Sequence, residues 1–186
     1  MKKMLFMVMA MMSFVMVNAQ ELSGIYYAAD EYQEKANEFV GDMGLEYDIK
    51  VKFGLFFVGS EMDLIVEFKT GAQGVDVEGQ LAFMGDYTRT DDHIDCTFSK
   101  DRISVSLQNL TTDDPDMRAM LENDETMDTV YGMVESMMEE VVQERKDELF
   151  EICQFCKSLT LVSQSEDGFT ADFGNDIVID FVKLKN

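Results

Sequence analysis

The residues best suited to chemistry are three cysteines and the single histidine. Cys153 and Cys156 form a Cys-x-x-Cys pair at the end of a helical pattern, and His93 lies three residues before Cys96. Zinc is bound by such side chains, but residues three apart on a strand face opposite sides of the sheet. A redox pair normally begins a helix, where the helix dipole stabilises the thiolate, whereas this pair ends one. The pattern therefore disfavours both a zinc site and redox catalysis.

A structural disulfide is the simplest interpretation of these cysteines. The alternation of its strand predicts that Cys96 faces inward, and Cys153 and Cys156 continue the apolar side of the predicted helix. In an oxidising compartment Cys96 would then pair with Cys153 or Cys156, closing a loop of more than fifty residues. Pairing of Cys153 with Cys156, or three buried free thiols, are the alternatives.

The sequence lacks the common catalytic motifs. Any histidine-dependent triad would need His93, and Gly59-Ser60-Glu61-Met62 lacks the second glycine of a nucleophile elbow. Phosphate-binding and dinucleotide-binding fingerprints are absent. The acidic run Asp124–Asp128 lacks the glycine and the closing glutamate of a calcium loop. We therefore expect no enzymatic activity, no cofactor and no metal.

A set of aromatic side chains could line a ligand-binding cavity. They are predicted to face the interior of a sheet, and they are Tyr47, Phe53, Phe57, Phe68, Phe83 and Phe98. Such rings could equally fill the interior, because small barrels are usually packed by their own side chains. The sequence leaves both interpretations open.

Length and composition indicate one globular domain. The chain has 186 residues, 46% of them hydrophobic, with 15 basic and 37 acidic side chains and a net charge of −22. The hydrophobic content is sufficient for a core despite the charge. A charge this negative repels phosphate backbones and anionic membranes, which excludes nucleic acid as a favoured partner.

The N-terminus has the pattern of a secretory signal peptide. Lys2 and Lys3 precede an apolar run of 14 residues, Met4–Val17, and Val17-Asn18-Ala19 predicts cleavage after Ala19. The run is shorter than the ~20 residues needed to span a bilayer. Gln20 would be the first mature residue, where a lipoprotein would carry cysteine. We expect residues 1–19 to be removed and the protein to be exported, periplasmic or secreted, and soluble.

Alternation of apolar and polar residues predicts about eight to ten antiparallel strands. Alternation extends from Tyr47 to Phe57 and is repeated in seven further segments: Met62–Phe68, Val75–Phe83, His93–Phe98, Arg102–Leu107, Leu159–Ser163, Phe169–Phe173 and Ile177–Leu184. We expect a turn at Lys100-Asp101 between the fourth and fifth of these eight segments. The predicted class is mainly β with an α insertion.

Helical periodicity occupies two other segments. A short helix is predicted at Asp30–Met43, and a long helical insertion at about 114–157 begins with Asp114 as N-cap and Pro115 at the first position. Asn123-Asp124 marks a possible break. Residues 113–151 carry 14 acidic and three basic side chains. The predicted apolar face of the insertion is Met117, Leu121, Val130, Val134, Met137, Val141, Leu149 and Ile152.

The chain resembles small exported bacterial lipocalin-like proteins, which are β-barrels of the calycin type. The resemblance depends on the opening Gly24-Ile25-Tyr26, on Gly85-Asp86-Tyr87 before a polar turn, and on a closing β-hairpin. It implies a single domain over 20–186, an antiparallel up-and-down barrel with the acidic helical insertion before the last three strands, and a small apolar ligand in the barrel. It implies no catalysis. The alternative is a packed structural or interaction module of the cell envelope that meets a basic protein through its acidic helix.

Overall fold

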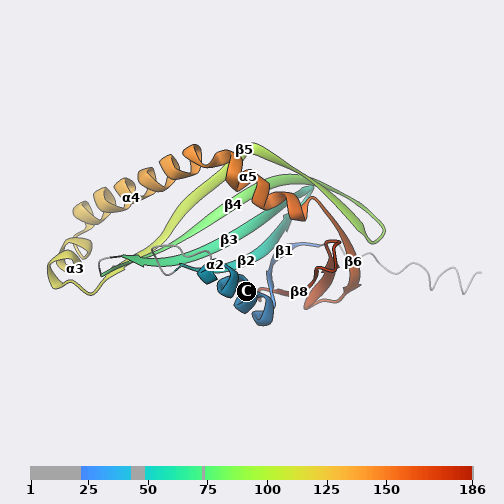
Figure 1. The fold of residues 1–186 in the computed structure, drawn as a ribbon. Helices are drawn as coiled ribbons and strands as arrows, with labels where there is room; N and C mark the ends of the chain where they lie inside the picture. The colour runs from blue at the N-terminus through green and yellow to red at the C-terminus, as the bar shows by residue number, and fades with distance from the viewer. Residues whose placement is uncertain (1–21, 43–48, 73, 186) are drawn as a thin grey trace, which may run out of the picture.

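Eight antiparallel strands close into a barrel in chain order (Figure 1). The computed structural model describes residues 22–42, 49–72 and 74–185. Within these ranges the strands are β1 (Gly24–Ala28), β2 (Ile49–Val58), β3 (Glu61–Ala72), β4 (Val75–Thr90), β5 (His93–Thr112), β6 (Ser158–Gln164), β7 (Gly168–Asp172) and β8 (Val178–Lys183). Strand β1 pairs with both β2 and β8, which closes the ring. The predicted signal peptide and its cleavage site lie outside the described residues.

The alternation in β2 and β3 predicted the inward face correctly. Leu55, Phe57, Met62 and Leu64 are buried, whereas Lys52 between two inward residues is exposed. Because successive side chains of a strand point to opposite faces, one apolar set fixes the register of the pair. The mainly β, antiparallel class is confirmed.

Strand β5 corrects the prediction of two strands joined at Lys100-Asp101. The strand is continuous over 20 residues. Phe98 pairs with Gly85 and Ile103 pairs with Phe83, so the four residues Ser99–Arg102 lie opposite Met84 alone. This excess of three residues makes an irregular bulge, which a sheet tolerates without ending the strand. The polar pair that suggests a turn therefore marks a bulge.

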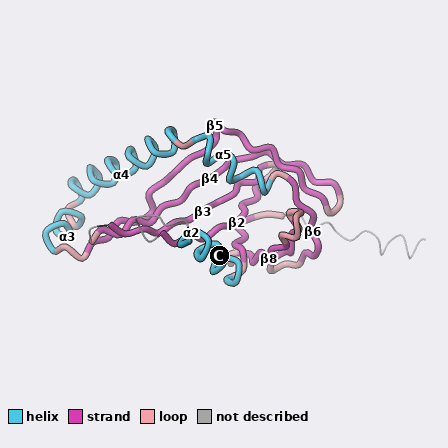
Figure 2. Tube along the Cα trace, viewed as in Figure 1, coloured by secondary structure: helices cyan, strands magenta, loops and turns pink. Residues whose placement is uncertain are grey.

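Helices lie on two sides of the barrel, α2 on one and α4 with α5 on the other (Figure 2). Helix α2 (Asp30–Asp42) precedes β2, and the predicted last residue Met43 lies outside the described residues. Between β5 and β6 come α3 (Pro115–Leu121), α4 (Asp124–Glu144), α5 (Lys146–Cys153) and a short 3-10 turn, η1 (Gln154–Cys156). Three helices thus stand where one segment with a possible break at Asn123-Asp124 was predicted. That break is confirmed, because α4 begins at Asp124, and a second one separates α4 from α5.

Side-chain caps explain where α3 and α4 begin. The Asp114 carboxylate accepts hydrogen bonds from the N–H groups of Asp116 and Met117, and the Asn123 side chain accepts one from Thr126. Such caps satisfy backbone donors that the first helical turn leaves free. None of the described helices is long and apolar enough to cross a membrane.

Aromatic rings fill the side of the barrel formed by β1, β7 and β8. Tyr26 contacts Phe57 and Phe169 edge to face, with ring centroids 5.9 and 5.0 Å apart, and Phe169 stacks on Phe181 at 4.9 Å. These offset and edge-on arrangements are the favoured ones for aromatic pairs. This part of the barrel is a packed core.

Candidate functional site

A pocket of about 260 Å³ lies between helix α4 and strand β5. Its lining residues come from two short stretches, Ile103, Ser104 and Val105 of β5 and Glu139, Val142 and Gln143 of α4. The three apolar side chains are buried or half-buried, and the three polar side chains are exposed. The pocket therefore has an apolar wall and a polar rim.

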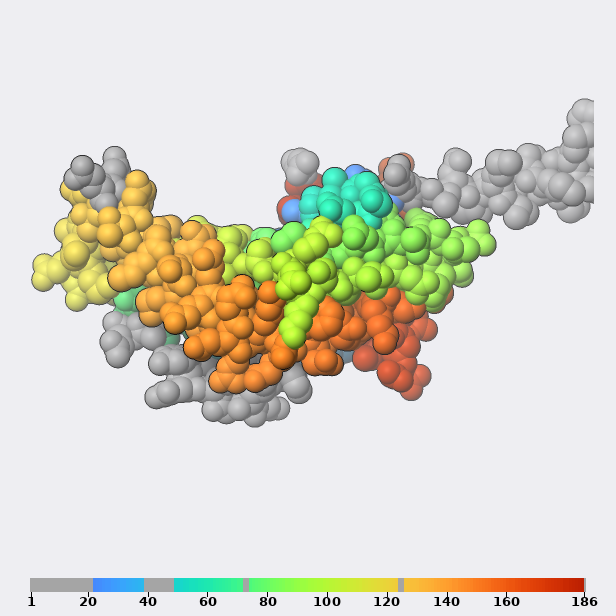
Figure 3. All heavy atoms as spheres, turned by 90° about the horizontal axis from the view of Figure 1, so that it is seen from above, coloured from blue at the N-terminus to red at the C-terminus, as the bar shows by residue number. Residues whose placement is uncertain are grey.

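The pocket exists because a helix, and not a strand, lies along most of β5. Strand β6 pairs only with His93–Asp95, and α4 and α5 run beside the remainder of β5 (Figure 3). The Tyr131 hydroxyl on α4 accepts a hydrogen bond of 3.1 Å from the Leu110 backbone N–H. A helix cannot continue the ladder of backbone hydrogen bonds, so side chains must fill the space between it and the strand.

Gly79 allows α4 to lie close to the inner face of the sheet. A Cβ atom at this position would stand 2.5 Å from Cζ of Phe68 and 2.9 Å from Cε of Met138. Glycine in a strand often marks such a close approach. Phe68 and Met138 therefore occupy the space above Gly79, and α4 covers the inward side of β3 and β4 at this point.

Two ion pairs attach the start of α5 to the bulge of β5. Lys100 pairs with Asp147, and Lys146 pairs with Asp101 at 3.1 Å. The positive and negative partners are exchanged between strand and helix, so each element supplies one lysine and one aspartate. The bulge thus holds the C-terminal end of the helical cover in place.

The predicted apolar face of the insertion is confirmed only in part. Leu121, Val130, Val134 and Leu149 of that face are half-buried, whereas Met117, Met137, Val141 and Ile152 are exposed. Val142 is buried and Met138 contacts the sheet side. Apolar residues occupy two stripes one position apart in α4, and periodicity alone does not say which of them packs.

The predicted aromatic ligand residues divide into two groups. Phe57, Phe83 and Phe98 are buried in the core, and Phe57 contacts Tyr87 and Phe169. Phe53 and Phe68 are half-buried. Tyr47 lies outside the described residues.

Sequence reasoning placed Ile103 and Val105 inward but missed the α4 side of the pocket between α4 and β5, because that side depends on the phase of the helix.

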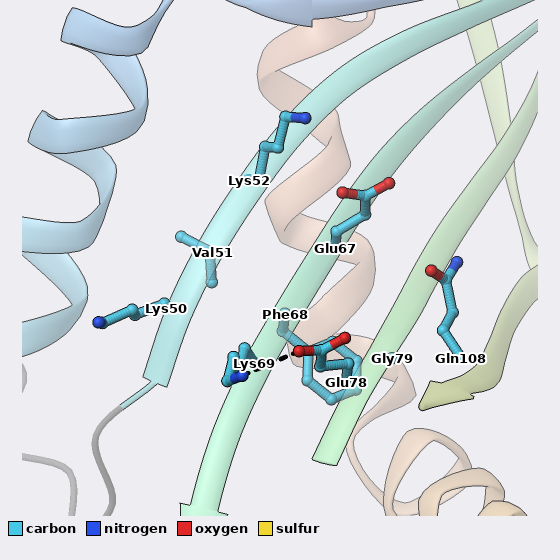
Figure 4. A pocket seen from close by; sticks show the side chains of 9 residues that line it. All are labelled: Lys50, Val51, Lys52, Glu67, Phe68, Lys69, Glu78, Gly79 and Gln108. Carbon is cyan, nitrogen blue, oxygen red and sulfur yellow. Dashed lines mark hydrogen bonds and ion pairs between the residues drawn. The ribbon is translucent and has the colours of Figure 1, made fainter. Parts of the chain in front are cut away.

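A second pocket, of about 200 Å³, lies over the sheet (Figure 4). The lining residues come from three neighbouring rungs, each a row of residues paired across β2, β3 and β4. The two outer rungs form the side walls, and they are Lys52 with Glu67 and Lys50 with Lys69 and Glu78. The middle rung is Val51, Phe68 and Gly79. Lys69 donates to Glu78 at 2.9 Å, and this bond raises the pKa of Lys69 and lowers that of Glu78. The side walls of this second pocket are charged, whereas the rung between them is apolar.

The three cysteines lie together in the buried core as free thiols. Burial raises the pKa of Cys96 to about 12, with smaller contributions from Asp63 and Cys153. Burial also raises the pKa of Cys153 and of Cys156. Such thiols remain protonated near neutral pH and are poor nucleophiles.

The structure does not contain the predicted disulfide between Cys96 and Cys153 or Cys156. The Cys96 thiol is directed to the Met62 carbonyl oxygen at 3.7 Å, and the Cys153 thiol donates to that of Phe150 at 3.0 Å. Each of these two sulfurs therefore has a backbone carbonyl as its neighbour.

His93 lies on the other side of its strand from Cys96. Its ring nitrogens lie 3.1 Å from the Ser158 hydroxyl and 3.3 Å from the Thr160 hydroxyl, both on the exposed face. The residues of the zinc alternative are therefore not brought together. Within the described ranges no group of three or more His, Cys, Asp or Glu side chains is arranged to hold a metal ion.

Comparison with known proteins adds no relative: no family model matches the chain, and no curated protein or solved structure matches it. Its function must therefore be inferred from the pocket and the surface.

Proposed function

We propose that this chain is an exported, non-enzymatic, lipocalin-like protein that binds a small apolar molecule between α4 and β5. The closed eight-stranded ring is compatible with this fold. The N-terminal pattern of Lys2, Lys3 and the apolar run supports export. The pocket between α4 and β5 supports the proposed ligand binding.

One observation carries the proposal: the apolar wall of this pocket continues into half-buried side chains of the inner face. Val105 lines the pocket, and Phe53, Val66 and Leu81 share its rung across the sheet. All four pack against the core without being fully buried. Apolar area that is still partly wet supplies binding free energy when a ligand covers it, at about 25 cal/mol per Å².

The rim of the pocket restricts the chemical class of the ligand. Glu139 is exposed there and places a negative charge at the entrance, while Ser104 and Gln143 can donate hydrogen bonds. A carboxylate or phosphate headgroup would be repelled in a chain of this net charge. The proposed ligand is therefore a neutral or cationic molecule with an apolar body.

Titration with Nile red, a neutral apolar fluorophore, tests this proposal. We expect saturable binding to the wild-type protein and a loss of about tenfold in affinity for Ser104→Trp, which fills the pocket entrance. Val162→Trp, at an exposed position on β6, is the matched control and should bind like the wild type. Native mass spectrometry of protein purified from its source should show a retained small molecule.

The proposal fails if Nile red does not saturate and the purified protein carries no small molecule. It also fails if Ser104→Trp binds Nile red as tightly as Val162→Trp does, because the site would then lie elsewhere.

A further inference from the structure

Helix α4 exposes a regular apolar stripe on its outer side. Met133, Met137 and Val141 follow one another at intervals of four residues and are 59%, 60% and 57% exposed. Residues four apart on a helix lie one above the other, so these three form one continuous surface, here named the methionine stripe. Isolated exposed apolar residues are common, but an aligned series of them marks an interaction surface.

The methionine stripe is not required for packing within the chain. The side of α4 that meets the barrel uses Tyr131, Met138 and Val142 instead. The helix therefore has a second apolar face in addition to the one that holds it on the sheet.

Negative charge lies beside the methionine stripe. Helix α4 contains seven acidic residues and no basic residue. Glu140 and Glu144 are exposed and follow Met137 and Val141 by three residues, which places them beside the stripe. The acidic residues of α4 whose side chains are described lie between Asp128 and Glu144. None of them forms an ion pair, whereas Asp147 and Glu148 of α5 are both paired.

We propose that the methionine stripe docks a basic amphipathic helix of a protein partner. Methionine side chains adapt to differently shaped apolar residues and are frequent on surfaces that bind such helices. Basic residues flanking the partner's apolar side would meet Glu140 and Glu144, which gives the complex charge complementarity.

The same charge disfavours the other occupants of the stripe. An anionic membrane surface repels a helix with seven acidic residues and no basic one. A second copy of this chain would bring two identical acidic faces together, which costs free energy through like-charge repulsion. Binding to an anionic membrane or to a second copy through the stripe would therefore contradict the proposal.

Fluorescence anisotropy with a labelled 18-residue Leu/Lys amphipathic helix tests the proposal on the full mature chain. We expect the triple variant Met133→Ser, Met137→Ser, Val141→Ser to lose at least about tenfold in affinity. The double variant Glu140→Gln, Glu144→Gln should lose several-fold and show a weaker dependence on salt. The matched control, Val162→Ser with Val182→Ser, removes exposed apolar residues from β6 and β8 and should leave affinity unchanged.

Four results would overturn the proposal. The first is a Leu/Glu helix binding as tightly as the Leu/Lys helix. The second is the triple variant binding like the wild type while its circular dichroism is unchanged. The third is a dimer, detected by analytical ultracentrifugation, that the triple variant abolishes. The fourth is binding to phosphatidylglycerol vesicles through the stripe without binding to the Leu/Lys helix.

Discussion

Asn37 pairs with both backbone groups of Val51. The side-chain oxygen of Asn37 accepts a hydrogen bond of 2.6 Å from the Val51 N–H, and its nitrogen donates one of 3.0 Å to the Val51 carbonyl oxygen. Gln33, one helical turn earlier, makes the same two bonds with Phe53. Four helical residues rise about 6 Å and two strand residues about 6.8 Å, so the two amides match alternate residues of the strand.

These amides take the place of a strand. β1 pairs with β2 only from Gly54 to Phe57, so no strand among the described residues pairs with this edge of β2 before Gly54. An unpaired edge exposes backbone groups that can recruit other chains. Helix α2 covers this edge and satisfies it with side chains.

Removal of either amide should destabilise the fold. Asn37→Ala and Gln33→Ala each delete three side-chain hydrogen bonds, two of them to β2, and leave a backbone N–H and C=O of that strand without partners, at a cost of about 1–3 kcal/mol. Glu34→Ala on the exposed side of the same helix is the control. Urea unfolding measures the difference. If all three variants unfold at one urea concentration, the amides do not support the edge.

Local alternation explains why the strands could be predicted and the edge could not. Leu55 and Phe57 reveal their strand because burial on one face forces every second residue to be apolar. Gln33 and Asn37 carry no such signal, since a polar residue on a helix normally faces water. They find backbone groups to bind only because β1 does not extend along β2 before Gly54, and that depends on the tertiary structure.

Of the pocket between α4 and β5, the sequence predicts only the residues of β5. The residues of α4 depend on which side of the helix faces the sheet. Val134, Met138 and Val142 form an apolar stripe one position from Met133, Met137 and Val141. The two stripes have the same spacing, so a rotation of about 100° exchanges them. Contacts of Met138 above Gly79 decide the phase, and they depend on residues far apart in sequence.

Two glycines should respond oppositely to alanine. Gly132 lies within α4, and nothing lies within 4 Å of a Cβ added there, so Gly132→Ala should stabilise the protein by about 0.5–1 kcal/mol through helix propensity. At Gly54 the added Cβ would stand 2.6 Å from the Tyr26 carbonyl oxygen, so Gly54→Ala should cost about 1–3 kcal/mol. Thermal unfolding of both variants gives the two signs. A stable Gly54→Ala would show that β1 and β2 can separate without cost.

The buried thiols should react slowly in the folded protein. With a pKa of about 12 in place of 9.0, Cys96 has a thiolate population near pH 7 that is lower by about a thousandfold. We expect iodoacetamide to label the native chain slowly and Ellman's reagent to count three thiols after unfolding without reductant. A count of one thiol would instead support the disulfide predicted from the sequence.

Stability should fall as the pH rises above about 9. The folded state raises the pKa of Cys96 from 9.0 to about 12, so the folded chain retains a proton that the unfolded chain loses in this interval. Its contribution is therefore complete below pH 9 and is lost progressively toward pH 12. Urea midpoints between pH 7.5 and 10.5 measure the slope. Cys96→Ala should make the slope shallower, and an identical slope would remove Cys96 as its source.

Reversing one charge should loosen α5 without unfolding the barrel. Lys146 is largely covered and pairs with the exposed Asp101, so Lys146→Glu replaces an attraction with a repulsion and leaves Lys100 and Asp147 in place. Because one partner is fully solvated, the change in global stability should remain within about 1 kcal/mol. Hydrogen exchange should nevertheless accelerate in α5 and stay unchanged in β3, since local opening needs only the local contacts to fail. Adding Asp101→Lys restores opposite charges and should restore protection of α5. If the double variant exchanges as fast as Lys146→Glu alone, the bulge of β5 does not hold the helix through this pair.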